Sequence, residues 1–242
     1  MRLFSYKLLD QPLMRKIYYL FLCQLFLLSG CAKNAQHLSD SLQLAIFGPE
    51  QPVISAEKVA SIPYASIYIQ QNDNPLALMV LAWAEPAKNN THTALKWISA
   101  GQEMVVTEGG RITKTLNLGG GNLVNIESHS VDPLLLGLHN ASTPRYWEFY
   151  LSWQPGYHFH YLAQSRFVSE GEQIKQLPNG ESRSLLLFNE QITIAALDQQ
   201  YHNYYWIDPT SGAVVATEQQ LAPGLNRYAL AVGKSYLNQG GI

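Results

Sequence analysis

The chain has 242 residues, a formal charge of −2 at pH 7 and 14 tyrosines. This length supports one ordinary domain or two small ones, with a sizeable apolar core. The slightly negative charge balance argues against nucleic-acid binding, which requires clustered positive charge. Only 14% of the residues are charged, which together with the many aromatic residues favours a β-rich body.

The N-terminal residues predict a secretory signal. Arg15 and Lys16 precede an apolar run over residues 17–27, and small residues follow it in Leu28-Ser29-Gly30-Cys31. A basic start, a short apolar segment and small residues before a cleavage point are typical of such signals. Counted to Cys31, this segment spans about 15 residues, which is shorter than the roughly 20 that a transmembrane helix needs. We therefore assign residues 1–30 to a signal peptide, with Met14 as an alternative start.

Leu28-Ser29-Gly30-Cys31 also resembles the lipobox of bacterial lipoproteins. This resemblance implies cleavage before Cys31 and lipidation of that cysteine, with palmitate among the acyl chains. The next residue is Ala32 rather than the aspartate that commonly retains enteric lipoproteins in the inner membrane, so we expect an outer-membrane anchor facing the periplasm. Cys23 leaves with the signal, and the mature chain then has no cysteine for a disulfide.

Two short helices are predicted before the strands begin. Residues 31–41 read as a polar tether. Residues 39–48 have a serine cap, an apolar run and a final glycine, and residues 55–60 read as one capped turn that stops before Pro63.

The rest of the chain predicts β-strands, because short runs rich in aromatic and β-branched residues alternate with glycine-bearing turns. The expected strands are residues 64–69, 77–83, 93–98, 103–107, 111–115, 145–153, 157–163, 183–188, 191–197, 204–207 and 213–217. Residues 131–138 fit a short helix or a packed loop. The fold class is all-β with minor α: antiparallel meanders forming two curled sheets or open barrel-like units. Residues 42–242 form a single domain, with two subdomains divided near 120–145 as the alternative.

Aromatic residues mark a candidate binding surface in the second half. Tyr146, Glu148 and Tyr150 share one side of a predicted strand, and the opposite side carries core residues: Trp147, Phe149, Leu151 and Trp153. Sugar rings could stack on the tyrosines while Glu148 accepts hydroxyl hydrogen bonds. Tyr204 and Trp206 are further candidates for this surface, as are Tyr157, Phe159, Tyr161, Tyr201 and Tyr205. The alternative is that tyrosine is simply a favourable strand residue with a polar tip.

Metal chemistry finds little support in the sequence. His158 and His160 are expected on one strand face, with Glu148 or Asp132 as a third ligand. Zinc sites need three or four protein ligands, and the usual ligand spacings are missing. We expect no metal and no cofactor.

Catalysis finds equally little support. No Gly-x-Ser-x-Gly motif is present. Glycan cleavage needs two carboxylates about 5 to 9 Å apart, and the sequence does not pair Glu148, Asp132, Glu103 or Asp208. Asp208 instead has a ready role in a turn before Pro209. Arg111 and Lys114 fall on opposite faces of one strand and read as solvated charges.

Several short motifs, in this order, resemble the YjbF / GfcB / YmcC family of lipoproteins. They are Ile62-Pro63-Tyr64-Ala65-Ser66-Ile67-Tyr68, Leu81-Ala82-Trp83-Ala84, Leu95-Lys96-Trp97, Val105-Val106-Thr107, Gly110-Arg111-Ile112-Thr113-Lys114-Thr115, Tyr205-Trp206-Ile207-Asp208 and Gly212. The resemblance covers most of residues 42–221. It implies a lipoprotein of an exopolysaccharide or group 4 capsule secretion cluster, whose partners are other proteins of that cluster. It supplies no catalytic residues.

The function expected from the sequence is therefore non-catalytic. An outer-membrane lipoprotein would assist exopolysaccharide or capsule assembly or export by binding partner proteins or glycan. The first alternative is a periplasmic carrier or chaperone for a lipid or lipoprotein, and the second is a polysaccharide-modifying enzyme. A large apolar cavity would favour the carrier, and two carboxylates across a cleft would favour the enzyme.

Overall fold

The structure, a computed structural model, describes residues 54–87 and 92–236. The signal peptide, Cys31, the tether and the helix expected over residues 39–48 lie outside the described residues. Within the described ranges, no helix combines the length and the apolar character that a membrane span requires.

The first described element is the short helix α3 (Ala56–Ser61). Ser55 caps it, because its hydroxyl accepts a hydrogen bond from the backbone N–H of Lys58 at 3.3 Å. Ile62, immediately before Pro63, is the C-cap of the helix. The capped turn predicted from the sequence is confirmed, and its buried residue Val59 packs on the outer side of the sheet.

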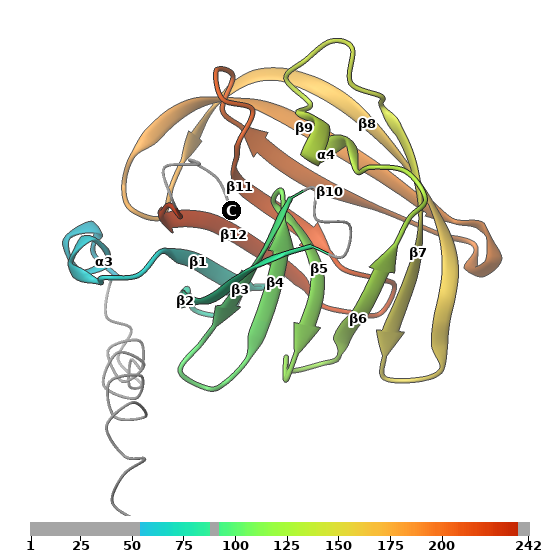
Figure 1. The fold of residues 1–242 in the computed structure, drawn as a ribbon, viewed down its shortest axis with the longest axis horizontal. Coiled ribbons are helices and arrows are strands. Elements are labelled where there is room, and N and C mark those ends of the chain that lie inside the picture. Colours follow the sequence, from blue (N-terminus) through green and yellow to red (C-terminus); the bar gives the residue numbers. More distant parts are fainter. Residues whose placement is uncertain (1–53, 88–91, 237–242) are drawn as a thin grey trace, which may run out of the picture. The chain divides into compact units, whose positions relative to one another are not determined.

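The described part of the chain forms one antiparallel sheet of twelve strands in the order β5-β4-β3-β2-β1-β12-β11-β10-β9-β8-β7-β6 (Figure 1). The all-β prediction is confirmed. The strands are β1 (Ser66–Gln71), β2 (Ala77–Pro86), β3 (Thr93–Ile98), β4 (Met104–Glu108), β5 (Arg111–Leu116), β6 (Asn122–Glu127), β7 (Tyr146–Gln154), β8 (His158–Gln176), β9 (Ser182–Ile194), β10 (Gln199–Ile207), β11 (Val214–Gln220) and β12 (Arg227–Lys234). Two short helical pieces, α4 (Pro133–Leu136) and η1 (Ala195–Leu197), interrupt them.

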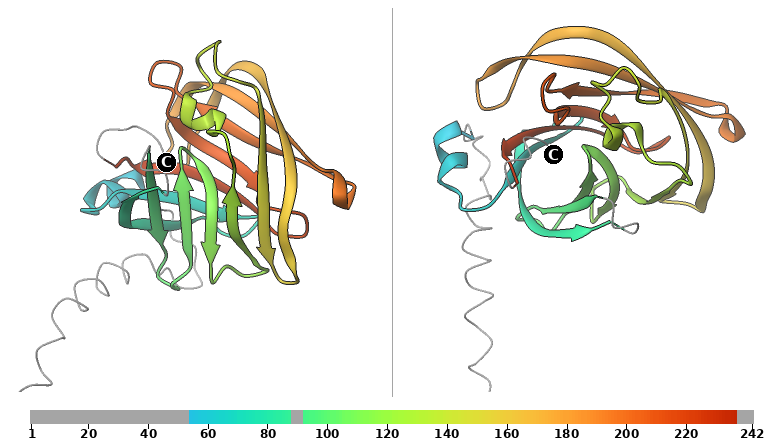
Figure 2. Two further views of the ribbon diagram at one scale, coloured as in Figure 1. Left: turned by 45° about the vertical axis from the view of Figure 1, so that its right-hand side comes forward. Right: turned by 45° about the horizontal axis from the view of Figure 1, so that its top comes forward.

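This sheet curls into a nearly closed barrel (Figure 2). The first and last strands pair in its middle, with Tyr68 of β1 opposite Ala231 of β12. The two edges, β5 and β6, meet through side chains instead of a strand ladder. Thr115 Oγ1 accepts from the N–H of Leu123 at 2.9 Å. Asn122 Oδ1 accepts from Thr115 Oγ1 at 3.3 Å and thus completes the seam.

Alternating side chains give the sheet two cores. Inward residues such as Met79, Trp97 and Phe149 fill the barrel. Outward residues such as Tyr68, Leu185 and Trp206 form a smaller cluster outside the sheet, which α3 and the β8–β9 hairpin cover. A single curled sheet can be apolar on both faces in this way, which explains why the sequence of β2 shows no clean alternation.

The predicted strands are mostly confirmed, but two were misjudged. β8 continues to Gln176, well past the predicted end at residue 163, and residues 191–194 belong to the same strand as residues 183–188. β6 and β12 were not predicted. The polar residues in β8 and the Asn189-Glu190 pair in β9 look like strand ends, yet backbone pairing continues through them. Residues 133–136 adopt the short helix rather than the packed loop.

Candidate functional site

Arg111 lies at the centre of a polar network inside the barrel. It begins β5, and its guanidinium is held between two carboxylates: Nε donates to Asp132 at 2.5 Å, and Nη2 donates to Glu190 at 2.8 Å. Asp132 precedes α4 and also caps it by accepting from the N–H of Leu134 at 3.0 Å. The three charged side chains are at most 7% exposed.

Every side of this network has a partner. Glu190 accepts two bonds from Arg111 and further bonds from Ser165 at 2.6 Å, Tyr205 at 3.1 Å and Asn203 at 3.3 Å. The guanidinium carbon lies 4.7 Å from the ring centre of Trp147, with Tyr205 at 5.6 Å. Cation–π contacts of this kind add to the ion pairs in a desolvated site.

The electrostatics follow from burial and mutual contact. Burial alone lowers the pKa of Arg111, but the carboxylates of Asp132 and Glu190 outweigh it and raise that pKa well above the ordinary value. Burial raises the pKa of Asp132, and Arg111 offsets this only in part. Burial also raises the pKa of Tyr205 well above its usual range, so its hydroxyl stays a donor to Glu190.

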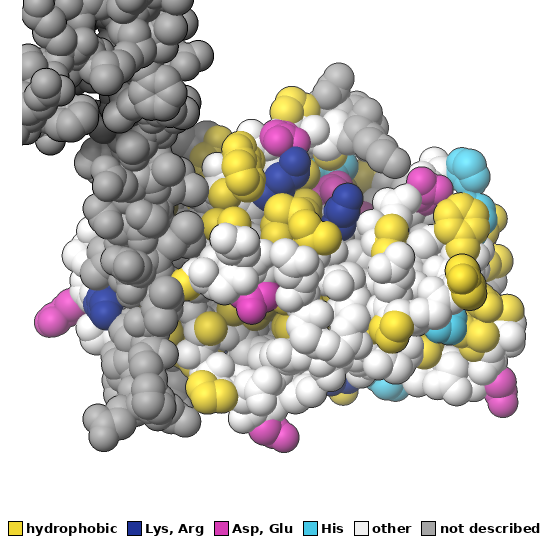
Figure 3. All heavy atoms as spheres, turned by 90° about the horizontal axis from the view of Figure 1, so that it is seen from below, with side chains coloured by type: hydrophobic (Ala, Val, Ile, Leu, Met, Phe, Trp, Pro, Cys, Tyr) yellow, Lys and Arg dark blue, Asp and Glu magenta, His cyan; other side chains and the backbone are white. Residues whose placement is uncertain are grey.

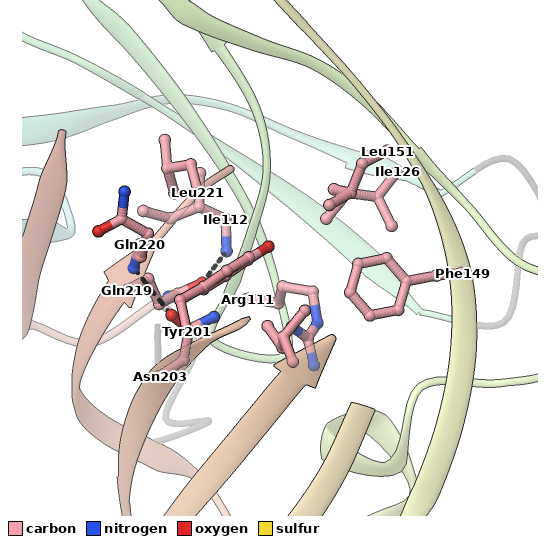
Figure 4. Close-up of a pocket in the computed structure, with 11 residues that line it drawn as sticks. Arg111, Ile112, Ile126, Phe149, Leu151, Tyr201, Asn203, Gln219, Gln220 and Leu221 are labelled. Atoms are coloured by element: carbon pink, nitrogen blue, oxygen red, sulfur yellow. Dashed lines mark hydrogen bonds between the residues drawn. The ribbon is translucent and has the colours of Figure 1, made fainter. Parts of the chain in front are cut away.

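The barrel interior next to this network is filled. The cavity that Arg111, Phe149 and Tyr201 help to line has a volume of about 10 Å³ (Figure 4), which is the space of about one water molecule. Gln219 of β11 reaches across to β5, where its side chain accepts from the N–H of Ile112 at 3.0 Å and donates to the carbonyl of Gly110 at 2.9 Å. Such an interior braces the barrel and offers no room for a substrate.

The prediction for Arg111 was wrong. The sequence suggested a solvated charge after a glycine turn, but Arg111 is 2% exposed, and its partners come from residues 132 and 190, far along the chain. The available signal was weak: Glu190 lies in a short polar interruption between Phe188 and Ile192, and a single sequence does not show which charges meet. Lys114 is exposed, as expected.

The carboxylates considered for glycan cleavage lie apart in the described structure. Asp132 is bound to Arg111. Glu148 accepts from Gln164 at 2.8 Å on the outer surface, and Glu103 is bound by Ser99. Asp208 organises the β10–β11 turn by accepting from the N–H groups of Thr210 and Ser211, which confirms its turn role. None of these carboxylates faces another across a cleft within the described residues.

The outer surface of β7 carries Tyr146, Glu148 and Tyr150, as the strand alternation predicted. Tyr146 is 69% exposed, and Arg166 of β8 lies over its ring at 5.7 Å. The opposite side is the core face, with four aromatic or aliphatic side chains at most 6% exposed: Trp147, Phe149, Leu151 and Trp153. That part of the prediction is confirmed.

His158 and His160 do not share a face, which corrects the sequence expectation. His158 stacks on the core residue Trp153 at 4.4 Å, whereas His160 stacks on the outward Tyr150 at 3.9 Å. His160 has a positive φ of 58° at an irregularity in the β7–β8 ladder. A bulge of this kind inserts an extra residue and reverses the alternation. No cluster of three potential metal ligands occurs among the residues that the structure describes.

The β7–β8 turn exposes further aromatic side chains. Figure 3 shows hydrophobic and histidine side chains gathered over this hairpin, at the right of the view. Tyr157 and Phe159 are fully or largely exposed there. Tyr161 instead packs against the barrel core, and so does Tyr201. Tyr205 is also inside, so these last three residues do not extend the outer surface.

Tyr204 and Trp206 face outward from β10 but lie elsewhere on the sheet, because β8 and β9 separate them from β7. Trp206 is 8% exposed, and Lys175 of β8 lies 3.5 Å above its ring centre. Trp206 and Lys175 border an outer groove with a volume of about 160 Å³, whose wall includes Tyr68 of β1. Tyr204 does not line this groove and packs against the outer core cluster. Of the five candidate residues, three therefore lie on the β7 surface, Trp206 lines the groove, and Tyr204 lies beside Trp206 on β10.

The fold and the interior define the class of protein, which is a nearly closed, twelve-stranded β-barrel with a buried polar network inside it. Among known proteins, the family model described as "Group 4 capsule polysaccharide lipoprotein gfcB, YjbF" matches residues 39–230. The chain belongs to this family of lipoproteins, as its sequence motifs had suggested.

Individual relatives agree with this assignment. "Uncharacterized lipoprotein YjbF" of Escherichia coli (strain K12) is 31% identical over 81% of this chain and 87% of its own length. "Uncharacterized lipoprotein GfcB" of the same organism is 26% identical over 89% and 94%. The crystal structure of the hypothetical lipoprotein YmcC from Escherichia coli (K12) has a TM-score of 0.67 at 23% identity, covering 82% of this chain and 96% of that one. The YmcC structure supports the fold. The family connects the chain with capsule polysaccharide.

Proposed function

We propose that this protein is a non-catalytic, lipid-anchored binding module that assists capsule or exopolysaccharide assembly or export. The observation that carries the proposal is the filled barrel interior, in which the cavity beside Arg111 holds only about 10 Å³. Since the charged groups there already satisfy one another, the contacts that matter are made on the outer surface. Membership in a capsule polysaccharide family supplies the process.

The proposed anchor is Cys31, at the end of Leu28-Ser29-Gly30-Cys31. Acyl chains on this residue would hold the domain at a membrane, and Ala32 favours the outer membrane with the domain in the periplasm. The protein would then reach only partners close to that membrane, which include other proteins of the secretion cluster and the polysaccharide itself.

The proposed contact surface comprises Tyr146, Glu148 and Tyr150 on β7, together with Tyr204 and Trp206 on β10. The exposed Tyr146 ring offers a face for stacking. Glu148 offers a surface carboxylate, which accepts a hydrogen bond from Gln164. Tyrosine and tryptophan combine an apolar body with a polar tip, which suits wet interfaces.

The two alternatives receive less support. A lipid carrier needs a large apolar cavity, and the cavity beside Arg111 holds only about 10 Å³. A glycan hydrolase needs two free carboxylates flanking its substrate, and Asp132 and Glu190 are both bound to Arg111.

Deletion of the gene, followed by assay of surface polysaccharide, tests the proposal. We expect a lower amount or altered chain length, restored by the intact gene and not by one carrying both Tyr146→Ala and Glu148→Ala. Normal polysaccharide in the deletion strain, under conditions in which the pathway is active, would overturn the proposed function. A Cys31→Ala variant should lose palmitate labelling, and retained labelling would refute the anchor.

A further inference from the structure

The end of the β8–β9 hairpin forms one wall of the outer groove. Only the first part of β8, up to Arg166, pairs with β7, while the strand continues to Gln176 paired with β9 alone. Gly171, with a φ of 82°, lies at an irregularity in that ladder and lets the hairpin arch over the outer face of β11 and β12 (Figure 2). Leu177 at its tip packs into the outer core cluster.

The groove between this hairpin and the sheet is suited to one ring-shaped group. Its volume is about 160 Å³, close to that of a cavity that accepts benzene, about 150 Å³. The floor is flat because small side chains line it on two neighbouring strands: Ala216 of β11, and Ala229 and Ala231 of β12.

Tyr68 supplies a polar group without a partner. The residue is 1% exposed, and its hydroxyl makes no hydrogen bond with any residue that the structure describes. Burial, with a smaller contribution from Glu181, raises its pKa, so the hydroxyl remains protonated at neutral pH. A buried unpaired hydroxyl is unfavourable, and an acceptor on a bound molecule would satisfy it.

A charged pair lies at the same groove. Lys175 Nζ is 3.2 Å from Glu218 Oε1 and also covers the Trp206 ring. Both side chains are partly exposed, at 28% and 37%. An ammonium donor beside a carboxylate acceptor matches two neighbouring hydroxyls of a sugar, since each hydroxyl both donates and accepts. Because the two charges cancel, the groove favours a neutral ring over an anion or a cation.

We infer that this groove binds a single neutral, pyranose-sized sugar ring of a polysaccharide. The Tyr68 hydroxyl donates to the ring or to one of its hydroxyls, and Lys175 and Glu218 bind an adjacent pair of hydroxyls. The alanine floor and the edge of Trp206 contact its apolar face. This inference rests on the proposed function and assigns the glycan contact to a site other than the β7 surface.

The test uses the full mature lipoprotein in detergent, with neutral oligosaccharides prepared from the surface polysaccharide of the organism that makes it. Calorimetry gives affinity, and saturation-transfer NMR reports which sugar protons contact the protein. Tyr68→Phe removes only the hydroxyl and should weaken binding about five- to tenfold. Lys175→Met should weaken it by about tenfold or more, because a charged hydrogen bond is lost.

Tyr228→Phe is the matched control, because Tyr228 is also a buried tyrosine but belongs to the barrel core. Its affinity should equal that of the unaltered protein. Without sugar, Tyr68→Phe should keep or raise the melting temperature, since an unsatisfied hydroxyl is removed. This measurement separates lost recognition from lost folding.

Three results are distinguishable. Selective loss in the Tyr68 and Lys175 variants supports the groove. Equal binding by the unaltered protein and Tyr68→Phe overturns the groove but leaves glycan binding on the β7 surface, which Tyr146→Ala then tests. No binding at millimolar sugar overturns the inference as well, whereas the proposed function still stands or falls with the deletion assay.

Discussion

Arg111 shows how a single buried charge can organise a barrel interior. It joins β5 to Asp132 before α4 and to Glu190 on β9, so three distant parts of the chain meet at one guanidinium. Removing one partner from a buried ion pair typically costs about 3–5 kcal/mol, although replacing the whole group by apolar residues often costs little. Glu190 and Asp132 have different further partners, so the stability losses of variants at these two residues can be compared directly.

Glu190→Gln should destabilise the protein by about 3 kcal/mol or more. Glutamine would turn an amide donor toward donors already present on Arg111, Ser165 and Tyr205. Asp132→Asn should cost less, about 1 kcal/mol, because asparagine still caps α4 and burial already disfavours the charged form of Asp132. Urea unfolding of both variants measures the difference, and a larger loss for Asp132→Asn would contradict this account.

Asp208 should make stability depend on acid pH. Hydrogen bonds from Ser211, together with those from Thr210 and the charge of Arg183, lower its pKa in the folded protein. Its stabilising contribution is therefore present above the unfolded-state pKa of about 3.9 and is lost as the pH falls through the lower folded-state pKa.

Asp208→Asn should keep the turn but remove this titration, so its free energy of unfolding should approach that of the unaltered protein below about pH 4. Asp208→Ala should be the less stable of the two at pH 7, by about 1 kcal/mol, since it also loses the acceptors. Chemical unfolding at a series of pH values checks both statements. A constant difference across that range would show that Asp208 does not titrate differently on folding.

The hairpin between β4 and β5 depends on Gly109-Gly110 for its shape. Both glycines have positive φ, and a Cβ at Gly110 would approach Val214 of β11 to 2.5 Å. Gly110→Ala should therefore combine backbone strain with a clash and cost roughly 2–4 kcal/mol. Gly171→Ala is the control, because Gly171 also has positive φ but nothing within 4 Å. Gly171→Ala should lower the free energy of unfolding by only about 1–2 kcal/mol. Equal losses of stability in the two variants would show that contact with Val214 does not contribute to the effect.

Individual strands were largely predictable because turn residues and β-branched runs are local signals. β3 and β5 begin where the sequence placed them. β9 was divided in two because Asn189-Glu190 reads as a polar break, although Glu190 is 0% exposed and serves Arg111. The bulge at His160 was likewise hidden, since positive φ at a histidine leaves no mark in the hydrophobic pattern.

Of the candidate site, the outward face of β7 followed from alternation alone. The network of Arg111, Asp132 and Glu190 did not, because its members are separated by up to 79 residues. The groove beside Trp206 could not be predicted either, since it depends on the far end of β8 folding over another part of the sheet. Tertiary contacts decide both features, and a single sequence does not display them.

The barrel as a whole should unfold in one step. A single sheet joins both halves of the chain, and its inner core includes residues from β1 to β12, so neither half can bury its apolar face alone. We expect circular dichroism and tryptophan fluorescence to give coincident urea transitions for the mature chain carrying Cys31→Ser. Two separate transitions would instead favour two subdomains divided near 120–145.

The pairing of β1 with β12 also bears on how the protein is made. Synthesis proceeds from the N-terminus, so β1 gains β2 at once but waits for its other neighbour until residues 227–234 have been added. Until then β1 and β11 both have an unpaired edge, and such edges readily join other chains. A chain that stops before residue 227 keeps both strand edges unpaired. The last strand therefore decides whether the protein forms a closed set of pairings or an aggregation-prone fragment.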